Sequence, residues 1–359
     1  MALKNIIGQD RAVGILLRTL HRGRLPSAYL FSGESGIGKR VTAVNLAKAV
    51  NCLEAFHSRQ LPNGGGEDAQ KRHEGPPADD FRLADACDRC HSCKKIDAET
   101  HPDLIVMTPE KGEIRVDQIR AVEDALSYMP YEGRRKVVVI DDADTMNQSA
   151  ANAFLKTLEE PSAESLIVLI SSNPDQLPET IRSRCSRIHF TPLSVEACRE
   201  VIQAVNSQHL TVDGGDRKRP ATVNHELSTV IRLSMGRPGL AVSSEPLKER
   251  ERFLSLLRNM VEGDSEIWAD REEMERWLDM AGIFLRDMAV GKITDDEGAL
   301  FNADIQKTLL GMSKATDIQS ILKAYRSIIQ LKGKLDFNLN KSITWNYTAS
   351  LLRAAVSNV

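Results

Sequence analysis

The stretch that most constrains the fold is residues 134–190, in which two apolar runs flank a helical pattern. Val137 to Ile140 form the first run, which stops at Asp141 and Asp142. The second run, Leu166 to Ile170, ends in the polar sequence Ser-Ser-Asn. Unbroken apolar runs of this length are typical of strands buried on both faces of a parallel sheet. Because such sheets bind ligands at the carboxyl ends of their strands, the polar residues predict a ligand site at one sheet edge.

A glycine-rich sequence follows a short strand candidate at 28–31 and precedes a helix candidate at 41–50. Within it, Gly33, Gly38 and Lys39 match the P-loop pattern G-x-x-x-x-G-K-[ST]. In a P-loop the backbone N–H groups cradle phosphates, and the lysine contacts the outer phosphate groups. Strand, loop and helix occur in the required order, so the sequence predicts a nucleotide-binding α/β fold.

The last position of that pattern is different in this chain. Arg40 stands where a P-loop has the serine or threonine hydroxyl that holds Mg²⁺, and a guanidinium has no acceptor with which to ligate a metal. Thr42 comes two residues later and is expected to point elsewhere on the helix. These residues predict a nucleotide-binding fold that has lost, or nearly lost, ATP hydrolysis. A tolerant ATPase that uses Arg40 and Asp142 is the alternative.

Four of the six cysteines are spaced as metal ligands. Cys87, Cys90 and Cys93 form C-x₂-C-x₂-C, and Cys52 precedes them by a long insertion rich in Gly, Pro and charged residues. Four thiolates suffice for a tetrahedral structural zinc site, and a longer loop adds little to the entropy cost of closing it. The alternatives are free thiols near a turn, or His91 in place of Cys52 as the fourth ligand.

The runs VVVIDDAD, NAFLKTLEEP and SSNPDQLPETIRSRC resemble the AAA+ subunits of replication clamp loaders, and among these the delta-prime subunits of the bacterial DNA polymerase III clamp loader. The likeness covers most of residues 1–190 with specific motifs, and the rest by general pattern. It implies an AAA+ P-loop α/β domain with a parallel sheet flanked by helices and a zinc-binding insertion at 52–93. A small helical lid at 191–243 and an all-α collar at 244–359 are implied to follow.

The resemblance also implies roles for individual residues. In the Ser-Arg-Cys tripeptide, Arg184 matches the arginine finger that clamp-loader subunits place in a neighbour's ATP site. Working motors end the acidic strand with Asp-Glu, whereas this chain has the shorter Asp142. The lid arginine that senses the γ-phosphate falls on Gly239, although Arg237 is a possible substitute. The nucleotide-site residues expected from pattern and resemblance are Gly33, Gly38, Lys39, Asp141, Asp142 and Asn173.

The region after residue 244 is helical by pattern, and each helix candidate has apolar residues at i, i+3 and i+4. The candidates are 246–261, 272–290, 316–335 and 341–356. Within the lid region, 206–222 is interpreted as a loop insertion. Its basic run at 217–219 is typical of a short solvated charge run rather than of a phosphate contact.

Charge and length exclude several classes of protein. The chain has 47 Lys and Arg against 50 Asp and Glu, a net charge of −3, so no global field attracts nucleic acid. No apolar stretch approaches the roughly 18 residues of a membrane span, and the N-terminal residues lack the apolar region of a signal peptide. We therefore expect a cytoplasmic protein, in which cysteines stay as thiols or bind metal rather than form disulfides.

Together these features predict a non-motor subunit of the DNA polymerase III clamp loader. Such a subunit is expected to join motor and clamp-opening subunits in a hetero-pentamer that loads the sliding clamp onto primed DNA. It is expected to hold structural zinc, to bind ATP at most without hydrolysis, and to lend Arg184 to a neighbour. The alternative, an active AAA+ ATPase motor of a clamp loader or related assembly, is left open by Lys39 and Asp141.

Overall fold

The structure, a computed structural model, describes residues 1–56, 85–210, 228–243, 246–262, 268–294, 299–334 and 339–356. Most of the insertion between Cys52 and Cys87 lies outside the described residues. So does most of the insertion predicted at 206–222, including its basic run at 217–219. The chain divides into two compact units, Met1–Val205 with Gly236–Gly239, and Asn206–Met235 with Leu240–Val359.

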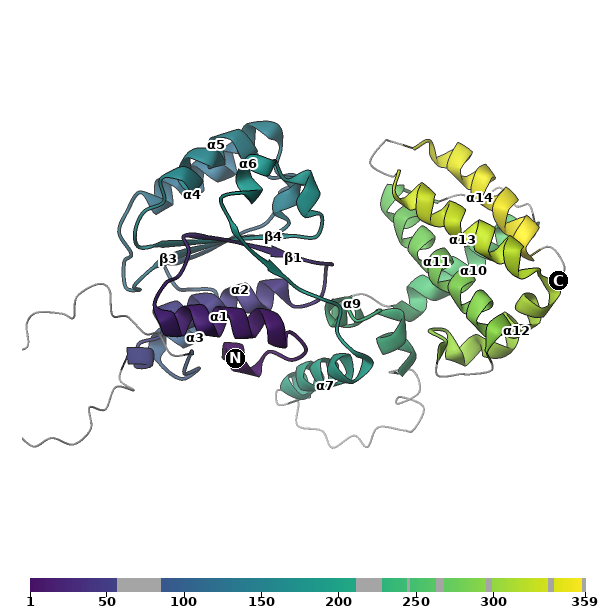
Figure 1. The fold of residues 1–359 in the computed structure, drawn as a ribbon, viewed down its shortest axis with the longest axis horizontal. Helices are drawn as coiled ribbons and strands as arrows, with labels where there is room; N and C mark the ends of the chain where they lie inside the picture. The colour runs from purple at the N-terminus through teal and green to yellow at the C-terminus, as the bar shows by residue number, and fades with distance from the viewer. Residues whose placement is uncertain are drawn as a thin grey trace, which may run out of the picture. The chain divides into compact units, whose positions relative to one another are not determined.

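The first unit is built on a five-stranded sheet in the spatial order β2-β3-β4-β1-β5 (Figure 1). All neighbouring strands pair in parallel, which confirms the predicted sheet. Every residue of β1, β3 and β4 is buried, as the apolar runs indicated. The strands are β1 (Ala28–Ser32), β2 (Leu104–Met107), β3 (Lys136–Ile140), β4 (Ser165–Ser171) and β5 (Ser186–His189).

Helices cover both faces of this sheet (Figure 1). Because successive strand residues point to opposite faces, Leu30, Val138 and Leu169 join the core beneath α4 and α5, where Phe154 is also buried. One face carries α4 (Val116–Leu126), α5 (Gln148–Glu159) and α6 (Glu179–Arg182). The other carries α1 (Asp10–Arg22), α2 (Lys39–Asn51) and α3 (His91–Asp97).

Helix α5 forms from the helical pattern between the two apolar runs, and it begins after Asn147. The side chain of Asn147 accepts a hydrogen bond from the backbone N–H of Ala150 at 2.8 Å, which satisfies one of the free donors of the first turn. After the sheet the chain continues as helices α7 (Val195–Leu210), 228–233 and α9 (Pro238–Ser243).

The described residues of the second unit form helices joined by turns and loops, and their core confirms the helical prediction. Trp268 packs against Trp277 and Trp345, with ring centroids 5.6 and 5.1 Å apart. These are all three tryptophans of the chain, so tryptophan fluorescence reports on this unit alone. Its main helices are α10 (Pro246–Glu262), α11 (Arg271–Ile293), α12 (Gln306–Ala315), α13 (Ile318–Lys332) and α14 (Lys341–Val356).

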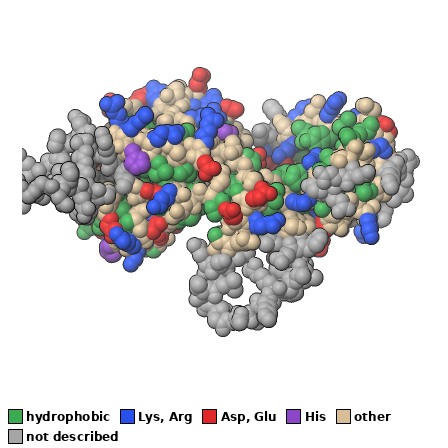
Figure 2. All heavy atoms as spheres, turned by 60° about the horizontal axis from the view of Figure 1, so that its bottom comes forward, with side chains coloured by type: hydrophobic (Ala, Val, Ile, Leu, Met, Phe, Trp, Pro, Cys, Tyr) green, Lys and Arg blue, Asp and Glu red, His purple; other side chains and the backbone are tan. Residues whose placement is uncertain are grey.

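The surface carries side chains of mixed character. On the face drawn in Figure 2, basic and acidic side chains both occur, with apolar side chains exposed between them. Among the described helices, none combines the length and the apolarity needed to cross a lipid bilayer.

Candidate nucleotide and metal sites

The P-loop joins β1 to α2 and lies at the carboxyl ends of the strands. Gly33, Gly36 and Gly38 all have positive φ, at 143°, 79° and 97°, a region that glycine enters without steric cost. A Cβ on Gly33 would lie 2.5 Å from the carbonyl oxygen of Phe190, so no side chain fits there. Because β1 lies beside β4 and β4 beside β3, the polar ends of all three strands meet at this edge.

Lys39 is directed into the loop. Its side chain is only 5% exposed, and Nζ donates to the carbonyl oxygens of Gly33 and Glu34, the second at 2.7 Å. A third, longer bond of 3.3 Å reaches Ser172 Oγ at the end of β4. Burial lowers the pKa of Lys39, and the nearby carboxylates, Asp142 first among them, oppose that shift. The lysine therefore lies at the base of the loop, between the ends of β1 and β4.

Arg40 points towards the acidic end of β3. Its Nη1 lies 3.6 Å from Asp141 Oδ2, and its Nη2 lies 3.3 Å from Glu99 Oε1. The hydroxyl of Thr42 donates to the carbonyl oxygen of Gly38 at 2.9 Å, so it is held within its own helix. The residues present do not fit the magnesium of a P-loop enzyme, because the hydroxyl ligand is missing and Asp141 already pairs with a cation.

The remaining carboxylates of this edge surround the end of β3. Asp142 has φ 45°, and partial desolvation together with Asp141 and Asp144 raises its pKa. Asp144 Oδ2 accepts the backbone N–H of Asn173 at 3.2 Å, which joins the ends of β3 and β4. The structure thus places Asp141, Asp142 and Asn173 at the same sheet edge as Lys39.

The segment Gly236–Gly239 contacts the P-loop directly. The backbone N–H of Gly239 donates to the carbonyl oxygen of Gly36 at 2.9 Å, and a Cβ on Gly239 would lie 2.9 Å from Gly36 Cα. Arg237 Nε lies 3.6 Å from Glu34 Oε2. The backbone of Gly239 therefore packs against the P-loop, and the Arg237 side chain pairs with Glu34 of the same loop.

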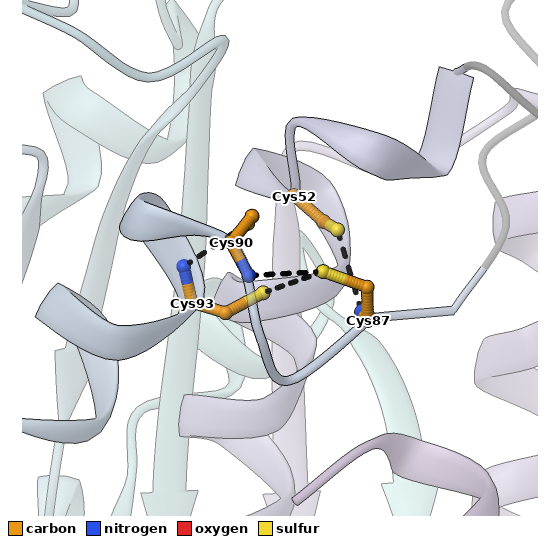
Figure 3. A group of neighbouring side chains, drawn as sticks. All are labelled: Cys52, Cys87, Cys90 and Cys93. Carbon is orange, nitrogen blue, oxygen red and sulfur yellow. Dashed lines mark hydrogen bonds between the residues drawn. The ribbon is translucent and has the colours of Figure 1, made fainter.

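The four cysteines form one cluster (Figure 3), and their Sγ atoms all lie within 4.8 Å of one another. Cys52 follows the last residue of α2, and Cys90 caps the start of α3. The backbone N–H groups of Cys87 and Cys90 donate to the sulfurs of Cys52 and Cys87 at 3.4 and 3.3 Å. His91 is exposed and lies outside the cluster.

This cluster is close enough to bind a metal ion. Tetrahedral coordination at about 2.3 Å places sulfurs about 3.8 Å apart, so only small inward movements are needed. Burial raises the pKa of the Cys52 and Cys93 thiols. Backbone N–H donors of Cys93 and Leu53 outweigh burial at Cys90 and lower its pKa to about 7. Four clustered sulfurs, of which Cys87 is half-buried, with neighbours that donate N–H groups form a donor set that suits a thiolate-preferring dication.

A buried carboxylate holds the loop that contains residues 131–135. Asp103 is fully buried and accepts the backbone N–H groups of Tyr131, Glu132 and Gly133 at 2.6, 2.9 and 2.6 Å. Asn51, at the end of α2, accepts the N–H groups of the next two residues. These bonds fix the loop while Tyr131 stays 85% exposed.

Arg184 lies far from the P-loop along the strands. It precedes β5, whose first residue pairs with Tyr29 near the start of β1, whereas the P-loop follows the end of β1. Its Nη1 donates to the carbonyl oxygen of Thr180 at 2.8 Å, and its Nη2 contacts Glu159 Oε1 at 2.6 Å. The side chain is 35% exposed. Arg184 therefore lies at the amino ends of the strands, whereas the nucleotide site of its own chain lies at their carboxyl ends.

Comparison with known proteins places these features in one family. A family model described as DNA polymerase III, delta subunit, matches residues 8–79 and 77–194. The chain belongs to the delta-prime clamp-loader family. This family member is 27% identical over 333 residues to DNA polymerase III subunit delta' of Bacillus subtilis strain 168, with 92% of each chain covered. The same subunit of Pseudomonas aeruginosa is 29% identical over 331 residues, covering 89% and 88%.

One solved structure is less similar to this delta-prime family member than the two relatives above. A DNA polymerase III gamma subunit-related protein of Thermotoga maritima is 19% identical, with a TM-score of 0.41. The alignment covers 94% of this chain and 98% of that one.

Three residues of these sites had no sequence signal. Glu99 contributes a carboxylate to Arg40 from a position 59 residues away in the chain. Asp144 is one of three aspartates after β3, and only the structure shows that it bonds to Asn173. Lys48 is a buried lysine in an otherwise ordinary helix. Each depends on a tertiary contact that no spacing in the sequence records.

Proposed function

We propose that this chain is a non-motor subunit of the DNA polymerase III clamp loader. In that role it helps load the sliding clamp onto primed DNA in the cytoplasm, within a hetero-pentamer of motor and clamp-opening subunits. Membership of the delta-prime family supports a place in the complex. The observation that carries the proposal is the position of Arg184 at the sheet edge opposite its own P-loop.

An arginine in that position serves a second subunit rather than its own. Its present partner, Glu159, forms an ion pair in which the two side chains are 35% and 51% exposed. Such surface pairs contribute about 0–1 kcal/mol, so little opposes exchange of Glu159 for a phosphate group. A guanidinium that reaches a neighbour's γ-phosphate stabilises the charge of phosphoryl transfer.

The non-motor part of the proposal is supported by the P-loop itself. Arg40 replaces the magnesium hydroxyl and pairs with Asp141, Asp142 has the shorter side chain, and Gly239 replaces the sensor arginine. If ATP binds at this P-loop, it is not hydrolysed there. A nucleotide site that lacks several parts of the hydrolytic apparatus suits a subunit that scaffolds the ring.

The other parts of the chain take supporting roles in the proposal. Residues 1–190 form the P-loop domain, 191–243 the lid and 244–359 the collar that holds the pentamer together. Zinc is bound by the four clustered cysteines, Cys52, Cys87, Cys90 and Cys93. Its role is structural, because four protein ligands leave no open coordination position for catalysis.

The experiment reconstitutes the complex from its motor and clamp-opening subunits with the chain present, omitted, or replaced by Lys39→Ala. Loading of the sliding clamp onto primed DNA is measured, and circular dichroism checks that the variant is folded. Omission should abolish loading, and Lys39→Ala should support it at the wild-type rate. If folded Lys39→Ala is as defective as omission, this chain is itself a motor and the proposal is wrong.

A further inference from the structure

The place of magnesium in a P-loop is defined by two oxygen ligands. One is the hydroxyl that follows the P-loop lysine, and the other is the aspartate at the end of a neighbouring strand. Magnesium needs close to octahedral oxygen coordination at about 2.0–2.1 Å, so both oxygens must face the same point. In this chain the corresponding residues are Arg40 and Asp141.

Arg40 fills the space between those positions with its own charge. Its guanidinium lies within 3.6 Å of Asp141 Oδ2 and 3.3 Å of Glu99 Oε1. One cationic side chain therefore bridges the end of β3 and the segment that follows α3. A guanidinium offers five N–H donors and no acceptor, so it compensates part of the charge of the two carboxylates and gives a metal nothing to coordinate.

We infer that Arg40 is a built-in cation of this P-loop and excludes the divalent metal from it. Asp141 is then the partner of Arg40 rather than a metal ligand. The site is left with backbone N–H groups, Lys39 and Arg40 to meet phosphate, and its affinity for a nucleoside polyphosphate does not depend on Mg²⁺.

The second partner of Arg40 comes from the cysteine module, which comprises the described residues 52–56 and 85–99 around the four cysteines. Glu99 follows α3, the helix that carries Cys93, and has φ 54°. Its backbone N–H donates to the carbonyl oxygen of Ile96 at 3.0 Å, which ends that helix. The cysteine module thus contributes the carboxylate of Glu99, which pairs with the guanidinium of Arg40.

The test measures binding of a fluorescent ADP analogue, MANT-ADP, to the purified full-length chain in Mg²⁺ and in EDTA. Three proteins are compared: wild type, Arg40→Thr, which restores the hydroxyl, and Arg40→Lys, which keeps the charge as a matched control. Arg40 is 42% exposed, so neither change is expected to disturb the core. Arg40→Ser repeats the measurement if the threonine variant does not fold.

The quantity compared is the ratio of affinity in Mg²⁺ to affinity in EDTA. For Arg40→Thr this ratio should exceed that of wild type and of Arg40→Lys by about tenfold or more, as expected when a metal ligand is restored. A smaller gain, including the absence of any Mg²⁺-dependent binding by the hydroxyl variants, overturns the inference. The inference deepens the proposed non-motor role, but it is tested by binding to one chain. It can therefore fail independently of the clamp-loading experiment.

Discussion

The ammonium of Lys48 donates to both carboxylate oxygens of Asp97 at 2.8 Å, although the lysine side chain is completely buried. A third bond, at 2.5 Å, reaches Asp88. Lys48 lies on α2, whereas the two aspartates lie in the segment that carries Cys87, Cys90 and Cys93. Burial alone would lower the pKa of Lys48, but these carboxylates outweigh it and raise the pKa above its ordinary value. The lysine therefore fastens the cysteine module to the P-loop helix.

Replacing Lys48 by methionine should destabilise the first unit. The change keeps the volume of the side chain but removes the buried ammonium from Asp88 and Asp97, which keep the N-terminal ammonium of Met1 at 3.0 and 3.8 Å. We expect a loss of about 2 kcal/mol in the free energy of unfolding, less than the roughly 3–5 kcal/mol of a fully buried broken pair, because both carboxylates are partly exposed. Urea unfolding followed by far-UV circular dichroism measures it.

The matched control for that substitution is Arg89→Ala. Arg89 also pairs with a carboxylate in the cysteine module, that of Glu54, but its side chain is 79% exposed. Its removal should leave the unfolding midpoint unchanged. Equal midpoints for Lys48→Met and Arg89→Ala would show that the buried lysine contributes nothing beyond an ordinary surface pair.

The cysteine cluster should contain about one zinc ion per chain. Protein purified without chelators is analysed by elemental mass spectrometry. Cys87→Ser should lose the metal and unfold at lower urea concentration, because binding energy at a structural site is also folding energy. Cys185→Ser, which changes a cysteine outside the cluster, should keep it. Zinc-free wild type, or full zinc in Cys87→Ser, would contradict the assignment.

Asp103→Asn should destabilise the loop that Asp103 holds. The amide replaces one carboxylate oxygen by a donor, so at least one partly buried backbone N–H loses its acceptor, at a cost of about 1–3 kcal/mol. Asp124→Asn, an exposed change on α4, is the control and should have no effect.

The stability difference between wild type and Asp103→Asn should depend on pH, which gives a second check. Burial opposes ionisation of Asp103, but the N–H groups of Tyr131, Gly133 and Glu132 together lower its pKa below the ordinary 3.8. A lowered folded-state pKa stabilises the fold above the unfolded-state pKa, and this stabilisation is lost as the pH falls through the folded value. The difference between wild type and Asp103→Asn should be constant from neutral pH down to about pH 5 and shrink in stronger acid. A difference that grows in acid would be inconsistent with an ionised Asp103.

The isolated chain should turn over ATP no faster than its Lys39→Ala variant. Arg40 leaves no hydroxyl for magnesium, and Asp142 is one methylene shorter than the glutamate of the motors. Steady-state phosphate release measures turnover. Hydrolysis by wild type that disappears in Lys39→Ala would identify the chain as an active motor.

The sequence predicted the sheet well where burial is continuous. The runs ending at Asp141 and Asn173 became β3 and β4, because a strand covered on both faces must be apolar throughout. The edge strand β5 had no such signal: of its four residues only Ile188 is buried. Its position became visible only through its pairing with β1.

The candidate sites divide in the same way. The P-loop and the C-x₂-C-x₂-C pattern are local in sequence, so their residues were found from spacing, whereas the structure joins Cys52 to that pattern across a long insertion. The partners of Arg40, Lys48 and Arg184 could not be found so, because each ion pair joins residues at least 25 positions apart. Glu159, Glu99 and Asp88 look like ordinary surface acids until the fold brings them to their cations.

The central claim, that the chain completes a neighbour's ATP site, is tested most directly by Arg184→Ala in the reconstituted complex. Assembly should remain intact, since Arg184 is partly exposed and pairs only at the surface. An arginine finger contributes about 10³ to 10⁵ in rate at its own site, so the complex should keep only the turnover of its other sites. Arg184→Lys should fail as well, because an ammonium lacks the planar fork.

Arg182→Ala is the matched control, since Arg182 lies two residues away and pairs with Asp175 in the same way. The measurement is DNA- and clamp-stimulated ATP hydrolysis by the whole complex, with size-exclusion chromatography to confirm assembly. Our account predicts reduced hydrolysis and slow clamp loading for Arg184→Ala and wild-type rates for Arg182→Ala. Wild-type hydrolysis and loading by an assembled Arg184→Ala complex would contradict it.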